Sequence, residues 1–293
     1  MFNKILNKSS ILIICFVFIS ITSCIKGKIH KCDELASHQN DSLSPCKGVE
    51  FNNIDIERAE KACKEAVSLY PENMRYNYQY GRVLLKKKDC EKSSDYMNMA
   101  IRGKYPEALN TLGRKYECGG ECISQQSNHF ALEWYHRAAY LGSSSAMYNI
   151  GNMYYKGKGV KQDCKTALEW YHKAAKKDNT LAMNEIGNMY NNGRCVVQDY
   201  EIALKWYNKA ARNGNDKAMN NIGFMYYKGR GVKQEYKMAI EWYHKAAKQG
   251  NVRAMYNISN MYEDGAGVQK DDIASKKWYK RAKQSDYSSL FSD

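Results

Sequence analysis

The chain has 293 residues, only three of them proline, and a formal net charge of +14. This length is enough for a sizeable core, and the scarcity of proline favours helices. Because the lysines are dispersed rather than gathered in one block, the charge predicts a solvated surface, and the export predicted from the N-terminal residues disfavours a nucleic-acid partner. An anionic membrane, peptidoglycan or an acidic protein stays open as a partner.

Residues 1–23 are predicted to be a lipoprotein signal peptide. Two lysines precede an apolar run over residues 11–21, which is too short to span a membrane but typical of a signal sequence. The run ends in "ITSC", which resembles a bacterial lipobox, so we expect Cys24 to be lipidated and to anchor the protein in the envelope. Under the enterobacterial sorting rule, Ile25 favours the outer membrane. An ordinary signal peptide cut near the same point is the alternative.

Residues 24–45 are rich in polar side chains, and we expect a partly flexible tether there. Residues 46–107 predict a helical lead-in, with "RAEKACKEAV" as a helix, "YPEN" as a turn and "YQYGRVLL" as a second helix that contains Gly81.

The remainder of the chain is built from a repeat. Each of five tryptophans is followed by tyrosine and lies 36 residues after the previous one: Trp134, Trp170, Trp206, Trp242 and Trp278. A second phrase, "AMYNIGNMYYKGKGV" and its variants, keeps the same period from Ala146, Ala182, Ala218 and Ala254, and a related phrase opens at Ala108. Repeats of this size indicate a solenoid, in which each unit buries its apolar face against its neighbours.

Both halves of a unit predict helices. In the Trp-Tyr half one apolar stripe contains Ala167, Trp170, Tyr171 and Ala174, so we expect the aromatic pair in the core. His172 lies about 140° from the origin of that stripe, which predicts a solvated position. Asparagine and lysine replace this histidine in other units, so we expect neither a metal site nor catalysis there. Aspartates stand at the N-cap positions 163, 199 and 271, and glycines separate the two halves.

These phrases resemble the Sel-1-like repeat, a relative of the tetratricopeptide repeat, and the lead-in resembles the tetratricopeptide-like segment of many bacterial relatives. The resemblance implies an all-α, right-handed superhelical solenoid of antiparallel helix pairs. The units would span residues 108–145, 146–181, 182–217, 218–253 and 254–286, followed by a tail at 287–293. The atypical last unit is expected, because one side of a terminal repeat meets water.

Export also changes what the cysteines predict, because an even number in an oxidising compartment suggests disulfides. Cys118 and Cys122 share an enlarged loop that could be closed locally, and a zinc site there lacks a second ligand pair. Cys164 and Cys195 fall at the same edge of adjacent repeats and could bridge them. Cys32, Cys46, Cys63 and Cys90 would then pair among themselves.

The resemblance further implies that the first helix of each pair lines a concave groove, where an asparagine after the repeated glycine grips a peptide. The residues just after that glycine are Arg114, Asn152, Asn188, Phe224 and Asn260, with Arg82 extending the row. A second row lies three positions before the glycine and consists of Asn110, Tyr148, Asn184, Asn220 and Tyr256. A third row lies four positions after the glycine and consists of Glu117, Tyr155, Asn191, Tyr227 and Glu263. We expect the amides to point away from the helix-packing stripe. A merely solvated inner face is the alternative.

No phosphate loop, nucleophile elbow or helix-borne metal motif occurs, so we expect neither an enzyme nor a cofactor. The predicted function is a monomeric envelope scaffold that binds a protein or peptide in the groove. The resemblance leaves open an immunity lipoprotein that neutralises a phospholipase-type toxin. A β-lactam-binding or hydrolysing protein is less favoured, because the paired cysteines of such relatives do not recur in each repeat here.

Overall fold

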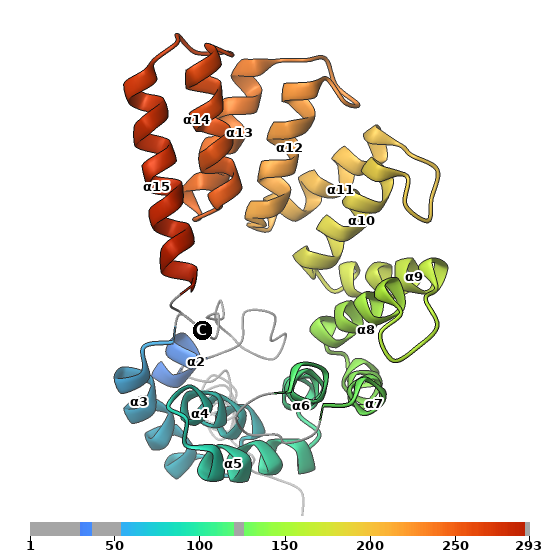
Figure 1. Ribbon diagram of the computed structural model, residues 1–293. Helices are drawn as coiled ribbons and strands as arrows, with labels where there is room; N and C mark the ends of the chain where they lie inside the picture. Colours follow the sequence, from blue (N-terminus) through green and yellow to red (C-terminus); the bar gives the residue numbers. More distant parts are fainter. Residues whose placement is uncertain (1–29, 37–53, 120–125, 291–293) are drawn as a thin grey trace, which may run out of the picture. The chain divides into compact units, whose positions relative to one another are not determined.

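The computed structural model describes residues 30–36, 54–119 and 126–290, and every element in these ranges is an α-helix. The chain divides into two compact units, residues 1–100 and 101–293, which are described separately. Figure 1 shows the helices of the second unit following one another in pairs, from α6–α7 to α14–α15. The all-α solenoid expected from the repeats is confirmed.

The first unit contains α2 (Lys31–Ala36), α3 (Ile56–Leu69), α4 (Met74–Lys86) and most of α5 (Cys90–Arg102). The two predicted lead-in helices are present as α3 and α4, and each begins at a side-chain cap. Asp55 accepts from the backbone N–H of Arg58, and Asn73 accepts from that of Arg75. A Cβ at Gly81 would lie 3.0 Å from Cγ of Met97, so glycine permits the close packing of α5 on α4.

The expected tether at 24–45 is wrong for the residues that the structure describes there. Residues 31–36 form α2, in which Cys32 and Asp33 are fully buried. Nε of Arg75 lies 3.0 Å from Oδ1 of Asp33, and Nη1 of Arg82 donates to the carbonyl oxygen of Ala36 at 2.7 Å. These partners lie more than forty positions along the chain, so local polar composition gave a misleading indication.

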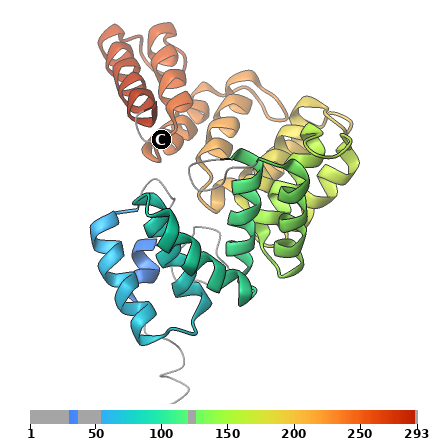
Figure 2. The same ribbon diagram turned by 60° about the horizontal axis from the view of Figure 1, so that its bottom comes forward.

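The second unit consists of five helix pairs. The first helices are α6 (Pro106–Cys118), α8 (Ser144–Lys156), α10 (Thr180–Asn192), α12 (Asp216–Lys228) and α14 (Val252–Asp264). The second helices are α7 (Asn128–Tyr140), α9 (Cys164–Ala175), α11 (Tyr200–Arg212), α13 (Tyr236–Lys248) and α15 (Asp272–Leu290). Figure 2 shows the same succession of pairs from a second direction.

The first helices begin two residues before the starts predicted from the repeated alanines. From α8 onward their N-caps are Ser143, Asn179, Asn215 and Asn251, and each side chain accepts from the backbone N–H three residues later, whereas Tyr105 before α6 makes no side-chain cap bond. The second helices keep the predicted caps: Asp163, Asp199 and Asp271 accept backbone N–H groups, whereas Glu235 makes no side-chain cap bond. The glycines between the halves end the first helices, as predicted, and they do so in a left-handed C-cap conformation, for example at Gly193 with φ 61°.

The core of each of the first four repeats is a tyrosine packed against a glycine. Tyr135, Tyr171, Tyr207 and Tyr243 are at most 2% exposed, surrounded by alanine, isoleucine and methionine. A Cβ at Gly187 would lie 2.5 Å from Cε1 of Tyr207, so no other residue fits there without movement. The tryptophans are only partly buried. The expectation that the Trp-Tyr pair is core is therefore correct for the tyrosines of the first four repeats, whereas Tyr279 is exposed and the tryptophans pack against the edge of the core.

The last helix, α15, continues to Leu290 and takes up most of the stretch predicted to be a tail. In the portion of the chain described by the structure, no helix combines the length and apolar character that membrane crossing requires.

Candidate binding face of the repeat stack

The first helices α6, α8, α10, α12 and α14 form one side of the second unit, which we call the first-helix face. Asparagine side chains join neighbouring helices across it. Nδ2 donates to Oδ1 in three such pairs: Asn149 to Asn110 at 2.9 Å, Asn221 to Asn184 at 3.0 Å and Asn257 to Asn220 at 2.9 Å. These bonds hold successive repeats in register.

This ladder changes the interpretation of the row three residues before the glycine. Asn110, Asn184 and Asn220 were predicted to contact a ligand, but their amide oxygens are used between repeats, and Asn110 and Asn184 are buried. The donors two residues before the glycine were missed by the sequence analysis. Their signal was available, because asparagine recurs there in three of the five units.

The row just after the glycine is also partly engaged within the protein. Oδ1 of Asn152 accepts the hydroxyl of Tyr171 at 2.7 Å, and Oδ1 of Asn188 accepts that of Tyr207 at 2.8 Å. The expectation that these amides point away from helix packing is wrong, since each one satisfies the polar end of a core tyrosine.

The other predicted positions differ from one another. Arg82 is buried in the first unit, so it does not extend the row. Arg114 is exposed. Glu117 accepts from the hydroxyl of Tyr135 at 2.8 Å and from Nζ of Lys158 at 3.1 Å.

Four further members of the predicted rows contact side chains of the protein itself. The hydroxyl of Tyr155 accepts from Nη1 of Arg194 at 3.0 Å, and Nδ2 of Asn191 donates to Oδ1 of Asn192 at 2.8 Å. The rings of Tyr148 and Tyr256 pack on the tyrosines of the second helices, with centroids 5.9 Å from Tyr171 and 5.5 Å from Tyr279, respectively.

A hollow remains on the first-helix face between α12 and α14. Its volume is about 380 Å³, within the usual size of a small-ligand site. The lining combines rings, amides and charges, from Phe224, Tyr227, Lys228, Tyr243, Asn257, Asn260, Met261, Glu263 and Asp264. The structure therefore brings four of the predicted groove residues, Phe224, Tyr227, Asn260 and Glu263, into one pocket.

The second helices form the opposite side, and there histidines join neighbouring repeats. His136, His172 and His244 each lie edge-on to the tryptophan of the following repeat, with ring centroids 5.2–5.3 Å apart. Burial lowers the pKa of each imidazole. The prediction of a solvated His172 is wrong. It considered only the position of the residue on its own helix, whereas Trp206 of the following repeat packs against the ring.

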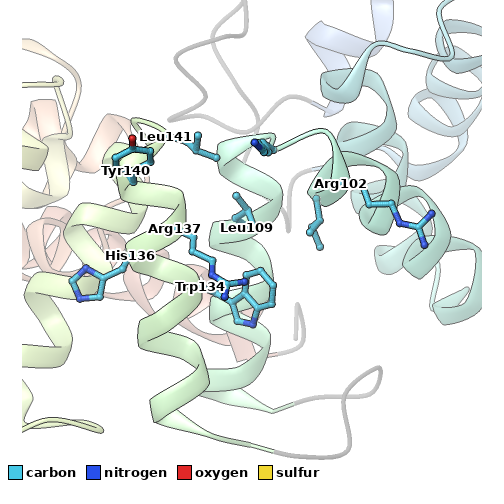
Figure 3. Close-up of a pocket in the computed structure, with 9 residues that line it drawn as sticks. Arg102, Leu109, Trp134, His136, Arg137, Tyr140 and Leu141 are labelled. Atoms are coloured by element: carbon cyan, nitrogen blue, oxygen red, sulfur yellow. The ribbon is translucent and has the colours of Figure 1, made fainter.

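A second hollow, of about 660 Å³, opens beside the first tryptophan. Figure 3 shows Trp134 and Arg137 on one helix and Leu109 on its neighbour. The guanidinium of Arg137 lies 4.5 Å from the ring centroid of Trp134. Arg102 and Lys104 are the other cations of this largely apolar lining.

The cysteines are confirmed in part. Cys164 and Cys195 form a disulfide that joins the start of α9 to the loop after α10, as predicted from repeat stacking. Cys32 bonds to Cys63, and Cys90 is also disulfide-bonded. Cys118 is a free, exposed thiol, so the local closure of its loop is not formed. Cys24, Cys46 and Cys122 lie outside the described residues.

Two disulfides between described cysteines indicate an oxidising, extracytoplasmic location. Within the described ranges, no group of three or more His, Cys, Asp or Glu side chains is placed to hold a metal ion.

Stacked helix pairs of one repeated pattern define a helical-repeat solenoid protein. The chain belongs to the Sel1 repeat family, whose pattern matches residues 106–143, 144–179, 180–215, 216–251 and 252–287. Each match contains one helix pair. A search of curated proteins by sequence gives no match.

Several solved structures are similar to this chain. A Sel1 repeat protein from Oxalobacter formigenes is 29% identical over 71% of this chain and 84% of its own, with a TM-score of 0.66. A protective antigen from uropathogenic Escherichia coli is also 29% identical, with a TM-score of 0.63. The similarity extends over 79% of this chain and 49% of the antigen, so this chain spans about half of the length of that antigen.

An immunity protein from Pseudomonas aeruginosa shares the fold at 21% identity, with a TM-score of 0.52 over 86% of this chain and 87% of its own.

Proposed function

We propose that the protein is a non-catalytic scaffold of the bacterial envelope that binds a partner protein on the first-helix face. The observation that carries this proposal is the hollow between α12 and α14, where four predicted groove residues line one pocket. Much of the remaining face is used between repeats, so the pocket is the part best suited to an external ligand.

The anchor is the second part of the proposal. Lipidation at Cys24 would hold the scaffold at the membrane, with the outer membrane favoured by Ile25. The extracytoplasmic location indicated by the disulfides supports export. A Cys24→Ser variant is expected to lose palmitate labelling and leave the membrane fraction. A wild-type protein without label, together with unchanged fractionation of the variant, would contradict the anchor.

Site-specific photo-crosslinking in intact cells tests the binding face. Benzoylphenylalanine in place of Asn260, which is exposed beside the pocket, is expected to capture a partner. The same probe in place of Lys248, exposed at the end of the second helix α13, is the matched control and is expected to capture none. Capture at position 248 alone would move the binding site to the second-helix side.

A narrower candidate is an immunity protein that inhibits a phospholipase-type toxin. It is favoured by the likeness to the Pseudomonas immunity protein, which extends over most of both chains, although 21% identity supports no more than a common fold. Co-expression with a periplasmic phospholipase-type toxin separates the two functions. An inhibitor restores growth, whereas a general scaffold does not.

A further inference from the structure

The fourth repeat breaks the hydrogen-bonding pattern of the core tyrosines. In the three preceding repeats the tyrosine hydroxyl donates to a side chain of the first helix: Tyr135 to Glu117, Tyr171 to Asn152 and Tyr207 to Asn188, at 2.7–2.8 Å. In the fourth repeat Phe224 takes the place of that asparagine. A phenyl ring offers no lone pair, so Tyr243 loses its acceptor.

Tyr243 is nevertheless only 2% exposed. Among the described residues no hydrogen-bond partner of its hydroxyl is present, although the side chain lines the pocket between α12 and α14. The ring is buried, but the hydroxyl oxygen is not enclosed by protein atoms and opens onto the pocket. Water or a ligand in the pocket is therefore what bonds to it, and a ligand with an N–H donor can take the place of that water.

The charges around the pocket decide the kind of ligand. Two carboxylates, Glu263 and Asp264, lie at its rim against one cation, Lys228. Neither carboxylate takes part in an ion pair with any described residue. Lys228 and Arg230 balance this charge formally, but the two carboxylates remain hydrogen-bond acceptors without an ion-pair partner, which favours a ligand that has both N–H donors and positive charge.

The aromatic lining supports the same choice. The guanidinium of Arg230 lies 5.2 Å from the ring centroid of Phe224, and Nζ of Lys228 lies 5.1 Å from that of Tyr227. Both rings therefore already attract cations of the chain itself. A guanidinium suits this lining better than an ammonium, because it is planar, stacks on rings and has five N–H donors for carboxylate and phenol oxygens.

Among the described repeats, the two carboxylates and the phenylalanine are found together only between the fourth and fifth repeats. The positions of Glu263 and Asp264 are taken by Tyr155 and Lys156, Asn191 and Asn192, and Tyr227 and Lys228 in the three preceding repeats. The acidic pair and the phenylalanine thus occur together only where they face a common pocket.

We propose that this pocket binds an arginine side chain of the partner protein. The guanidinium donates to the free hydroxyl oxygen of Tyr243 and to a rim carboxylate, and it stacks beside Phe224 and Tyr227. The inference rests on the proposed function, since it names the chemistry that the first-helix face recognises in its partner.

Ligand-observed saturation-transfer NMR on the full chain in detergent tests this inference with Nα-acetyl-arginine amide as the probe. The matched control probe is Nα-acetyl-citrulline amide, which keeps the shape of arginine but has no charge. We expect saturable transfer to the arginine probe and at least about tenfold weaker binding of the citrulline probe, which corresponds to one charge-assisted contact.

Two matched variants locate the binding. Phe224→Asn restores the asparagine of the preceding repeats, so it should fold, satisfy Tyr243 and abolish binding of the arginine probe. Phe224→Tyr keeps the ring and should retain binding. The double variant Glu263→Gln/Asp264→Asn should weaken it at least about tenfold.

Equal binding of both probes, absence of saturable binding to the wild type, or unchanged binding to Phe224→Asn would each overturn the inference. Capture of a partner by a photo-crosslinker at position 260 does not depend on any of these results. A failure of arginine recognition can therefore be distinguished from a failure of the binding face itself.

Discussion

The two units of the chain stabilise their helices by different means. In the first unit α2 is fixed by the buried carboxylate of Asp33, by Arg75 and Arg82, and by the disulfide from Cys32 to Cys63, none of which belongs to a repeated pattern. In the second unit the same small apolar core, tyrosine against glycine and alanine, occurs in repeat after repeat. A unique buried ion pair concentrates stability in a few side chains, whereas a repeated core distributes it among equivalent ones.

The largest effect is expected from breaking the polar centre of the first unit. Asp33→Ala removes a fully buried carboxylate that lies 3.0 Å from Nε of Arg75 and accepts from Gln79 at 3.1 Å. Loss of one partner of a buried ion pair should cost about 3–5 kcal/mol. Hydrogen exchange of the α3 and α4 amides measures this loss.

Two controls accompany that prediction. All five tryptophans lie in the second unit, so tryptophan fluorescence should report an unchanged transition. Glu60→Ala removes a surface ion pair with Lys87 and should cost at most about 1 kcal/mol. Full protection of α3 in Asp33→Ala would show that the carboxylate does not hold α2 in place.

The second effect concerns the repeated core. Tyr207→Ala empties a fully buried site in the central repeat and should destabilise the protein by about 3–5 kcal/mol. Trp206→Ala removes a half-buried side chain and should cost less, about 1–3 kcal/mol. Urea denaturation of the two variants provides the comparison. A larger loss of stability in Trp206→Ala than in Tyr207→Ala would show that the tryptophan is the main core residue.

The third effect concerns the amides that serve these tyrosines. Asn188→Ala leaves the hydroxyl of Tyr207 without its acceptor, whereas Nδ2 of Asn221 keeps its bond to Asn184, and the change should cost about 1–3 kcal/mol. Asn260→Ala at the exposed equivalent position should change stability by no more than about 0.5 kcal/mol. Equal denaturation midpoints would indicate that Asn188 is free for ligand, as the sequence alone suggested.

The sequence predicted the repeats well because their determinants are local and periodic. The spacing of Tyr171 and Ala174 fixes the buried stripe, and Gly193 marks the end of a helix by its backbone freedom. The disulfide from Cys164 to Cys195 followed from the same periodicity. In contrast, α2 depends on Arg75 and Arg82, which no local pattern connects to it.

The candidate site was predicted less well, because sequence periodicity gives a side chain's position but not its partners. Asn152 and Asn260 occupy equivalent positions, yet one accepts from a core tyrosine and the other is exposed beside a pocket. The difference depends on what the adjacent helix presents. Only the structure revealed that Phe224 deprives Tyr243 of its acceptor.

The smallest effect is expected from the histidines that join the second helices. Burial lowers the pKa of His136, His172 and His244, so the folded protein takes up protons less readily than the unfolded chain. Above the ordinary pKa of about 6.5 the histidines are neutral in both states, and the folded protein has its full stability. This stability is lost as the pH falls from there toward the lowered pKa values of the folded state. Lys173 and Lys176 add to the shifts of His136 and His172.

A matched variant isolates this pH dependence. Replacing the three histidines by asparagine, the residue found at the equivalent position 208, removes the titrating groups from the second helices. Urea midpoints at about pH 7.5 and about pH 5.5 bracket histidine titration and stay above the ordinary range of carboxylates. The wild type should lose more stability than the variant over this interval. An equal loss in both proteins would mean that the edge-on His–Trp contacts tolerate the charged ring, as a cation on an aromatic system can.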